Sequence, residues 1–294
     1  MSYECKILAD SASLGGVRLT TMQVTFPRIV LAEFNTHRVF SRNSASSRAI
    51  PVEKQIARVM EDPVVPVYWG KNQKGMQAEK ELTAEEIAVV REDWLTARNA
   101  AVDYARLMLA MGVHKQITNR LLEPFMWHTV IVTATEWENF FALRCNPMAQ
   151  PEIRVVAEMM RDEYARSTPV DKRPGEWHLP LVPDYVDLTA GQVGYSEKDI
   201  ARVSCGRCAR VSYLTHDGVR DPSADLDLAE RLRVSGHMSP FEHAAVVAET
   251  HDEVFDELFW TYEGRIWESH FIGNFRAPWV QYRKLLPNEE VFRG

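Results

Sequence analysis

The sequence predicts an α+β protein, in which helices pack against a mixed or antiparallel sheet. Two stretches, 18–26 and 127–134, are rich in β-branched and apolar residues and are typical of strands, and 244–249 predicts a further strand. Through 83–112, in contrast, apolar residues recur at helical spacing. Strand-like and helix-like segments of this kind in one chain indicate the α+β class.

The strand at 18–26 leads into a polar segment. Pro27 ends that strand and favours the first turn of a helix, which we expect to run from residue 28 toward His37. Residues 41–47 are polar and short, so they predict a loop. The chain therefore presents a cluster of polar side chains shortly after a strand.

The later helices are indicated by capping residues and periodicity. Thr83 and Glu86 form a capping-box pattern, and Gly112 is a stop signal for the same helix. The Pro-rich stretch 167–192 predicts an irregular connection. Further elements are a short helix at 118–122 that ends before Pro124, a strand or helix start near 209–213, and helices at 136–143, 150–164 and 226–235.

Composition excludes several classes of protein. Of the 294 residues, 46% are hydrophobic, which suits a globular protein with a sizeable core. The formal net charge of -7 argues against a nucleic-acid binder, which normally carries a basic excess. The chain has no apolar run long enough to cross a bilayer and no secretion signal at its start, so we expect a cytoplasmic protein without a membrane partner. The four cysteines are too sparse to indicate a disulfide framework.

Two segments have the residue types of a metal site without its spacing. Cys205 and Cys208 have the spacing of half a zinc site, but no second pair matches them. His237, Glu242 and His243 do not follow the order of the helical zinc-protease signature. We therefore expect two reduced thiols and a Ser-Pro turn at these places, and no metal.

The segment 36–48 concentrates basic side chains, His37, Arg38, Arg42 and Arg48, among short polar residues. Arginine forks bind phosphate bidentately, and hydroxyl groups add donors that permit close approach. A helix that ends near residue 37 would not attract an anion with its C-terminal dipole, so the arginines would have to do so. An anion site and a solvated polar loop are about equally compatible with this composition.

Arg120 and Arg144 lie among apolar residues. A charged side chain on such a stretch needs a partner or a polar pocket. Ion pairs with Glu123 or Glu138 are one explanation, and contact with a substrate phosphate or an ionising base is the other.

These segments together resemble the flavin-dependent thymidylate synthase family. The family's Arg-His-Arg motif, followed after seven residues by Ser, corresponds here to Thr36-His37-Arg38 and Ser46. The match continues through Asn43 and Arg48, and the segments 120–124 and 139–144 resemble two later family segments. The family's Gly-His-x-Thr/Ser-Pro-Phe-Glu-His block corresponds to 236–243.

The order of these segments differs from that of the family, in which the last block comes first. The sequence therefore resembles a circularly permuted member of the family. Circular permutation is tolerated when the chain termini lie close together. The resemblance implies one catalytic domain over 1–294, with a flavin-dependent thymidylate synthase-like fold. In it, 18–165 corresponds to the family's middle and C-terminal part, 166–200 is a connector, 201–250 corresponds to the N-terminal part, and 251–294 is an extra tail.

The resemblance also implies roles for individual residues. Arg144 would lie against the uracil of dUMP and favour its ionised form, which makes carbon 5 nucleophilic, so it is the expected catalytic residue. FAD would carry the hydride chemistry, with NADPH and methylenetetrahydrofolate as co-substrates, in a homotetramer with sites between subunits. The expected FAD-binding residues are Thr36, His37, Arg38, Ser44, Asn139, Ser212, His237 and Ser239. The expected dUMP-binding residues are Glu33, Ser46, Ser47, Arg48, Arg120 and Arg144.

Departures from the family pattern concern the product. Thr36 replaces an arginine, Ser44 replaces a glutamate, and Glu33 replaces a glutamine. The expected activity is transfer of a one-carbon unit to C5 of dUMP, forming dTMP. Two alternatives are hydroxymethylation of dUMP, and nucleotide binding without turnover on the same fold. In the tail, Arg276 or Arg283 is expected to assist nucleotide or folate binding.

Overall fold

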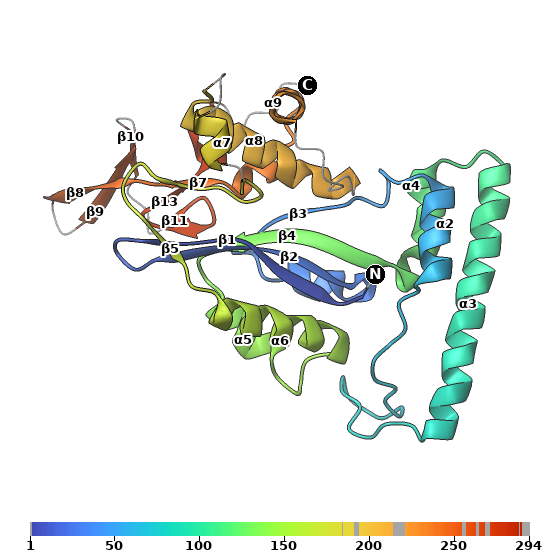
Figure 1. Cartoon of the computed structure of the whole chain (residues 1–294). Coiled ribbons are helices and arrows are strands. Elements are labelled where there is room, and N and C mark those ends of the chain that lie inside the picture. The colour runs from blue at the N-terminus through green and yellow to red at the C-terminus, as the bar shows by residue number, and fades with distance from the viewer. Residues whose placement is uncertain are drawn as a thin grey trace.

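A five-stranded sheet forms the centre of the computed structural model (Figure 1). Its strand order is β3-β4-β2-β1-β5, and all neighbours run antiparallel except β1 and β5, which run parallel. The predicted α+β class with a mixed sheet is therefore confirmed. The strands are β1 (Glu4–Ser13), β2 (Arg18–Pro27), β3 (Ser41–Ser44), β4 (Trp127–Ala134) and β5 (Val170–Lys172). The structure describes residues 2–183, 185–190, 194–213, 221–254, 257–262, 265–267, 271–287 and 289.

The two faces of this sheet are covered by different layers (Figure 1). Val130 and Val132 of β4 pack on the side of α5 (Glu138–Arg144) and α6 (Pro151–Arg166). Ile131, between them, contacts Cys208 at the end of α8 (Glu197–Ala209), and α9 (Pro222–Val234) packs against α8. The alternation of β4 side chains thus supplies both halves of the core.

A second, three-stranded sheet lies on the α8 side, in the order β13-β7-β6. Its strands are β6 (Trp177–His178), β7 (Ala245–Val247) and β13 (Trp279–Gln281). Ala245, Val247 and Trp279 pack with Leu19 of β2 in one apolar cluster. The chain after residue 176 is therefore built onto the sheet formed by the chain before it.

A chain of hydrogen bonds crosses this junction through the buried core. His178 Nε2 lies 2.8 Å from Thr21 Oγ1, which lies 2.8 Å from Thr133 Oγ1. Thr133 Oγ1 in turn lies 2.8 Å from His243 Nδ1. Both histidines are 0% exposed, and burial lowers the pKa of each to about 3. Neutral imidazole rings therefore join the two sheets.

Three helices close one end of the molecule (Figure 1). They are α2 (Val52–Glu61), α3 (Ala84–Ala110) and α4 (Lys115–Thr118). The capping box predicted for α3 is present, since Thr83 Oγ1 accepts from Glu86 N and Glu86 Oε2 accepts from Thr83 N. Ile56 of α2 and Val102 of α3 share one apolar cluster.

The remaining elements are short. They are the 3-10 turns η1 (Arg28–Val30), η2 (Asn119–Phe125), η3 (Arg210–Tyr213) and η4 (Ser239–Glu242), the helices α1 (Leu31–Asn35), α7 (Tyr185–Ala190) and α10 (Tyr282–Leu285), and the strands β8 (Glu249–Val254), β9 (Glu257–Tyr262), β10 (Arg265–Trp267), β11 (Phe271–Ile272) and β12 (Phe275–Arg276). In Figure 1, β8 to β10 form a small separate sheet at the end opposite α3.

Several local predictions were wrong. The loop expected at 41–47 begins as the edge strand β3, because its buried polar side chains find hydrogen-bond partners in later segments of the chain. The helix expected from residue 28 is a 3-10 turn followed by the five residues of α1. The helix expected to end before Pro124 is the 3-10 turn η2, which runs through that proline. The connection at 167–192 contains β5, β6 and α7. Cys205 and Cys208 lie buried in α8.

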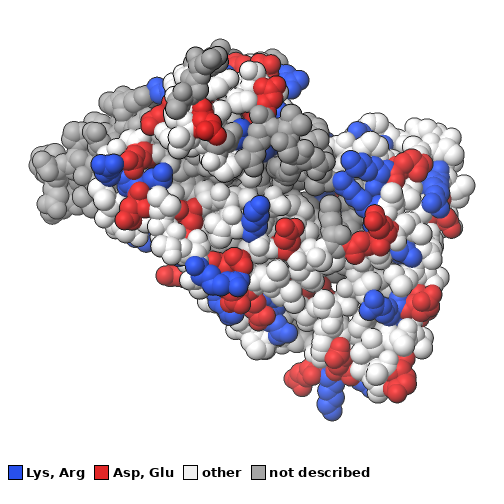
Figure 2. All heavy atoms as spheres, viewed as in Figure 1, with Lys and Arg blue, Asp and Glu red and all other residues white. Residues whose placement is uncertain are grey.

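Lysines and arginines are interspersed with acidic residues on the face shown in Figure 2. Among the helices that the structure describes, none is long and apolar enough to span a membrane.

Helices α8 and α9 approach each other closely at Gly206. A Cβ atom at this position would lie 2.3 Å from the backbone oxygen of Asp225, so Gly206→Ala must push the helices apart. We expect a loss of about 1–3 kcal/mol in the free energy of unfolding, measured by urea denaturation. The control is Gly15→Ala, where the nearest atom lies 4.0 Å away. Equal stability of both variants would contradict the close contact.

Candidate active site

Two arginines cover the C-terminal end of α1. Arg42 donates from Nη1 to the carbonyl oxygens of Phe34 (3.4 Å) and His37 (3.3 Å). Arg144, from α5, donates from Nη2 to the carbonyl oxygen of Glu33 at 3.3 Å. Cations are stabilised at the negative end of a helix, where the last carbonyl groups lack partners within the helix. The end of α1 therefore holds two guanidinium groups in place.

His37 lies between these arginines. Its side chain is 6% exposed, and its ring meets Phe140 edge to face with centroids 4.9 Å apart. Arg144 Nε donates to His37 Nε2 at 2.9 Å, so the neutral ring carries its proton on Nδ1. Burial, together with the charges of Arg144 and Arg42, lowers the pKa of His37 to about 4. The ring is therefore neutral at pH 7 and positions Arg144 as a hydrogen-bond acceptor.

Thr36 and Glu33 complete the surroundings of Arg144. The Thr36 hydroxyl donates to the Glu33 carbonyl oxygen (2.6 Å) and accepts from Arg144 Nη2 (3.1 Å). The carboxylate oxygen Oε2 of Glu33 is buried without a hydrogen-bond partner in the described part of the chain. Arg144, which lies more than 100 residues from Glu33, Thr36 and His37 in the sequence, is thus brought into one cluster with them.

Arg38 and Arg48 stand at the two ends of the polar segment. Both side chains are exposed, and neither forms an ion pair with any residue that the structure describes. Ser46 Oγ accepts from the backbone N–H of Arg48 at 3.3 Å, which orders the second end. Two guanidinium groups without a counter-ion therefore border this segment, as an anion site requires.

The segment that carries Arg120 anchors the same loop. Asn119 Nδ2 donates to the carbonyl oxygens of Ser47 (2.7 Å) and Ile50 (2.9 Å). Arg120 itself pairs with Glu123 at 2.7 Å, which is the structural ion pair considered from the sequence. The loop and the Arg120 segment are therefore adjacent, although Arg120 already has an acidic partner.

The late segments of the chain pack on β3. Asn43 Nδ2 donates to the carbonyl oxygen of Cys208 at 2.9 Å, and the Ser239 hydroxyl lies 3.4 Å from Asn43 Oδ1. Gln281 Nε2 donates to Ser41 Oγ at 2.8 Å. The structure thus places the 236–243 block beside the loop that begins at Thr36.

Five further predicted residues are Asn139, His237, Ser212, Arg276 and Arg283. Asn139 is exposed on α5, and the exposed His237 bonds through Nδ1 to the Ser235 hydroxyl at 3.0 Å. The side chain of Ser212 lies outside the described residues. Two acidic residues pair with Arg283, and Arg276 pairs with Glu136 at 3.3 Å. The partners of Arg283 are Glu242 and Glu289. A role of either arginine in nucleotide or folate binding stays a prediction.

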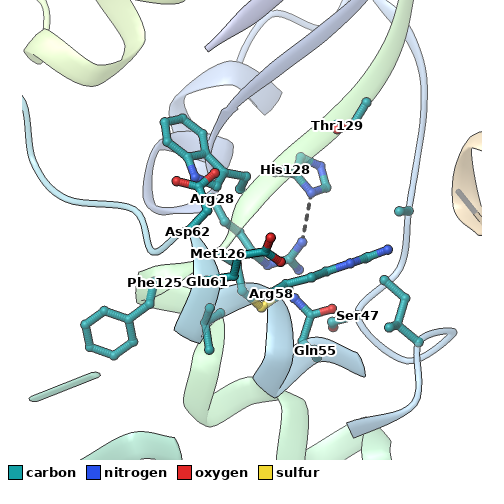
Figure 3. Close-up of a pocket in the computed structure, with 14 residues that line it drawn as sticks. Arg28, Ser47, Gln55, Arg58, Glu61, Asp62, Phe125, Met126, His128 and Thr129 are labelled. Carbon is teal, nitrogen blue, oxygen red and sulfur yellow. Dashed lines mark hydrogen bonds between the residues drawn. The ribbon is translucent and has the colours of Figure 1, made fainter. Parts of the chain in front are cut away.

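A pocket of about 300 Å³ lies between α2, the loop and the start of β4 (Figure 3). Its polar lining includes Arg28, Gln55, Arg58 and His128, none of which the sequence analysis singled out, together with the predicted residue Ser47. A sequence signal was weak, because α2 was not predicted and His128 lies within an ordinary strand pattern. Of these four pocket residues, only Arg28, directly after Pro27, adjoined a predicted element boundary.

The electrostatics of this pocket are uneven. Arg28 pairs with Glu123 at 2.9 Å and donates from Nη1 to His128 Nδ1 at 3.0 Å (dashed in Figure 3). Burial, followed by the charge of Arg28, lowers the pKa of His128 to about 3, so its ring is neutral and carries its proton on Nε2. Arg58 is half-buried and has no ion-pair partner among the described residues.

Comparison with known proteins gives one family match. The model of the family described as thymidylate synthase complementing protein matches residues 17–170, from β2 through α6. No curated protein matches the sequence. The solved structures that are similar include two of the UMP/dUMP methylase PolB from Streptomyces cacaoi. The form bound with 5-Br UMP is 18% identical over 56% of this chain and 90% of that chain, with a TM-score of 0.47. The form bound with 5-Br dUMP is 17% identical over 56% and 91%, also with a TM-score of 0.47.

Proposed function

Because the chain belongs to the thymidylate synthase complementing protein family, we propose that it transfers the one-carbon unit of methylenetetrahydrofolate to C5 of dUMP, forming dTMP. At the general level of the family, the chain is an enzyme that transfers a one-carbon unit to a pyrimidine nucleotide. The donor, the flavin and the product are the parts that we propose. The observation that carries the proposal is the fixed position of Arg144.

Arg144 is the group that would activate the base. Its guanidinium is oriented by His37 Nε2, by the Thr36 hydroxyl and by the carbonyl oxygen of Glu33. A cation fixed in advance stabilises charge that develops on a substrate without having to reorganise during the reaction. Placed against the uracil of dUMP, it would favour the ionised base and increase the electron density at C5. No cysteine nucleophile is required for this activation.

The substrate phosphate needs cations that have no other partner. Arg48 fulfils this condition, and Ser46 lies beside it with a hydroxyl group. Arg120 follows Asn119, whose side chain bonds to the loop at Ser47, so Arg120 is close enough to the loop to contribute to phosphate binding. Its guanidinium, however, already pairs with Glu123 and would have to interact with both groups. Arg48 is therefore the stronger candidate for the phosphate contact.

The residues proposed for FAD fit a cofactor that carries phosphates and a polar ring edge. Arg38 is an exposed guanidinium without an acidic partner in the described part of the chain. Asn139 has an exposed side-chain amide on α5, the helix that carries Arg144. The Ser239 hydroxyl lies beside β3, where it contacts the side chain of Asn43. Bound there, FAD would supply reducing equivalents that originate from NADPH. His37 would remain neutral beside it and keep Arg144 oriented.

The contacts between early and late segments support a single catalytic domain with a permuted order. Asn43 bonds to the end of α8, and Gln281 bonds to Ser41, so the 201–250 segment and the tail both pack against the family-matched part. We propose that this unit assembles as a homotetramer with sites between subunits.

Hydroxymethylation of dUMP is a second candidate, favoured by Glu33. Its buried Oε2 has no hydrogen-bond partner among the described residues, and an unpaired carboxylate oxygen can accept a proton from water. Water activated in this way would add to the one-carbon unit in place of hydride. The replacement Glu33→Gln removes this base while it keeps the size of the side chain.

Mass spectrometry of dUMP after incubation with the protein, FAD, NADPH and methylenetetrahydrofolate tests both candidates. We expect a methylated nucleotide if hydride is transferred and a hydroxymethylated nucleotide if water is added. In the second case, Glu33→Gln should lower the hydroxymethylated fraction. If neither product forms although dUMP binds, the protein binds the nucleotide without turnover.

A further inference from the structure

Two residues that line the pocket beside the polar loop carry buried hydrogen-bond donors without a partner in the described part of the chain. The His128 ring is 3% exposed, and its Nε2–H has no partner among the described residues. The indole Nε1–H of Trp127, which also lines the pocket, is buried and equally without a partner there. A buried donor left without an acceptor is costly, so these two groups indicate an acceptor that the chain itself does not provide.

Arg58 adds a positive charge to these donors. It lies one turn after Gln55 on the same face of α2, and both residues line the pocket (Figure 3). Arg28, the other arginine of the pocket, shares the carboxylate of Glu123 with Arg120, whereas Arg58 has no acidic partner in the part of the chain that the structure describes. A half-buried guanidinium of this kind needs a counter-ion.

We propose that this pocket binds the phosphate or carboxylate of a small organic anion, with Arg58 as the counter-ion. His128 Nε2–H and Trp127 Nε1–H supply further donors to the anion. The amide of Gln55, which is 3% exposed and whose Oε1 has no partner among the described residues, accepts from a neutral N–H or hydroxyl group of the same ligand. This site shares Ser47 with the expected dUMP contacts but not their guanidinium groups, because neither Arg48 nor Arg120 is among the described residues that line it.

The walls restrict the kind of anion. Ile50, Val59, Phe125 and Met126 give the pocket an apolar side, which suits an organic body of about one ring in a volume of about 300 Å³. Two acidic residues, Glu61 and Asp62, also line it. They disfavour further negative charge, so a ligand with one anionic group fits better than a polyphosphate.

Calorimetric titration of the full-length protein with three probes tests the proposal. The probes are dUMP for a nucleotide phosphate, benzoate for a carboxylate on a single ring, and inorganic phosphate for a free ion. For the probe that occupies the pocket, we expect Arg58→Gln to weaken binding about 10- to 100-fold, because a hydrogen bond to a charged group is lost. Gln55→Glu, which has the same size, should abolish that binding by placing a negative charge beside Arg58.

Arg91→Gln is the matched control, because Arg91 is an exposed arginine on α3, away from the pocket lining. It should bind every probe as the wild type does. A probe that binds only at the proposed dUMP site will lose affinity in Arg48→Gln and keep it in Arg58→Gln. The proposal is overturned if none of the three probes binds the wild type, or if every probe binds both pocket variants with wild-type affinity. Circular dichroism of each variant separates loss of binding from loss of the fold.

Discussion

Replacing Arg144 with glutamine is expected to lower kcat for conversion of dUMP about 100- to 1000-fold, the usual effect of removing one fixed electrostatic donor. The guanidinium is held by Thr36, His37 and the Glu33 carbonyl oxygen, so its orientation is set before substrate binds. A glutamine can retain one of these hydrogen bonds but carries no charge. The KM for dUMP should change less than kcat, because the charge acts mainly as the base becomes ionised.

A titration of His37 by NMR distinguishes this electrostatic effect from structural damage. The Arg144 charge is one cause of the low pKa of His37, so Arg144→Gln should raise that pKa from about 4. It should stay below 6.5, because burial is the larger cause and is unchanged. Arg161→Gln, at an exposed arginine of α6 that pairs with Asp162, should alter neither quantity. Wild-type kcat in Arg144→Gln would exclude the proposed role.

Lowering the pH from 7.5 to 5 is expected to reduce the free energy of unfolding by about 6 kcal/mol through the three most deeply buried histidines, and His37, whose pKa is lowered to about 4, adds to this loss. The pKa of His128, His178 and His243 is lowered to about 3 in the folded protein, whereas the unfolded chain titrates near 6.5. The unfolded chain therefore binds protons first, and stability that is present above pH 6.5 is lost as the pH falls toward 3. Each histidine contributes about 2 kcal/mol at pH 5, a large share of a typical total stability of about 5–15 kcal/mol.

Urea denaturation at a series of pH values measures this loss. In His243→Asn, the amide can still bond to the Thr133 hydroxyl, but one titrating group is gone. The difference in stability between pH 7.5 and pH 5 should then shrink by about 2 kcal/mol. His237→Asn, at an exposed position, should leave the difference unchanged. If His243→Asn showed the wild-type dependence on pH, the buried ring would not be held neutral.

The elements predicted correctly are those whose local pattern agrees with their final surroundings. Residues 127–134 form β4 as expected, because their β-branched residues face a packed layer on both sides. The helix with the Thr83 cap begins and ends as its signals indicate, since capping depends on a few adjacent residues. Strand β3 was mistaken for a loop because Ser41 and Asn43 are buried by partners more than 160 residues away. No local pattern contains that information.

The sequence by itself determined the family, through the spacing of Thr36, His37, Arg38 and Ser46 and the later Arg144. The spacing within a motif is sufficient to identify the family, because circular permutation changes the order of the segments but not the residues inside each motif. Only the tertiary structure decided that His37 is a neutral acceptor for Arg144, and that Arg28, Gln55, Arg58 and His128 enclose a pocket. A pKa and a cavity arise from burial and from charges that are close in space, and both depend on segments that meet only when the sheet is formed.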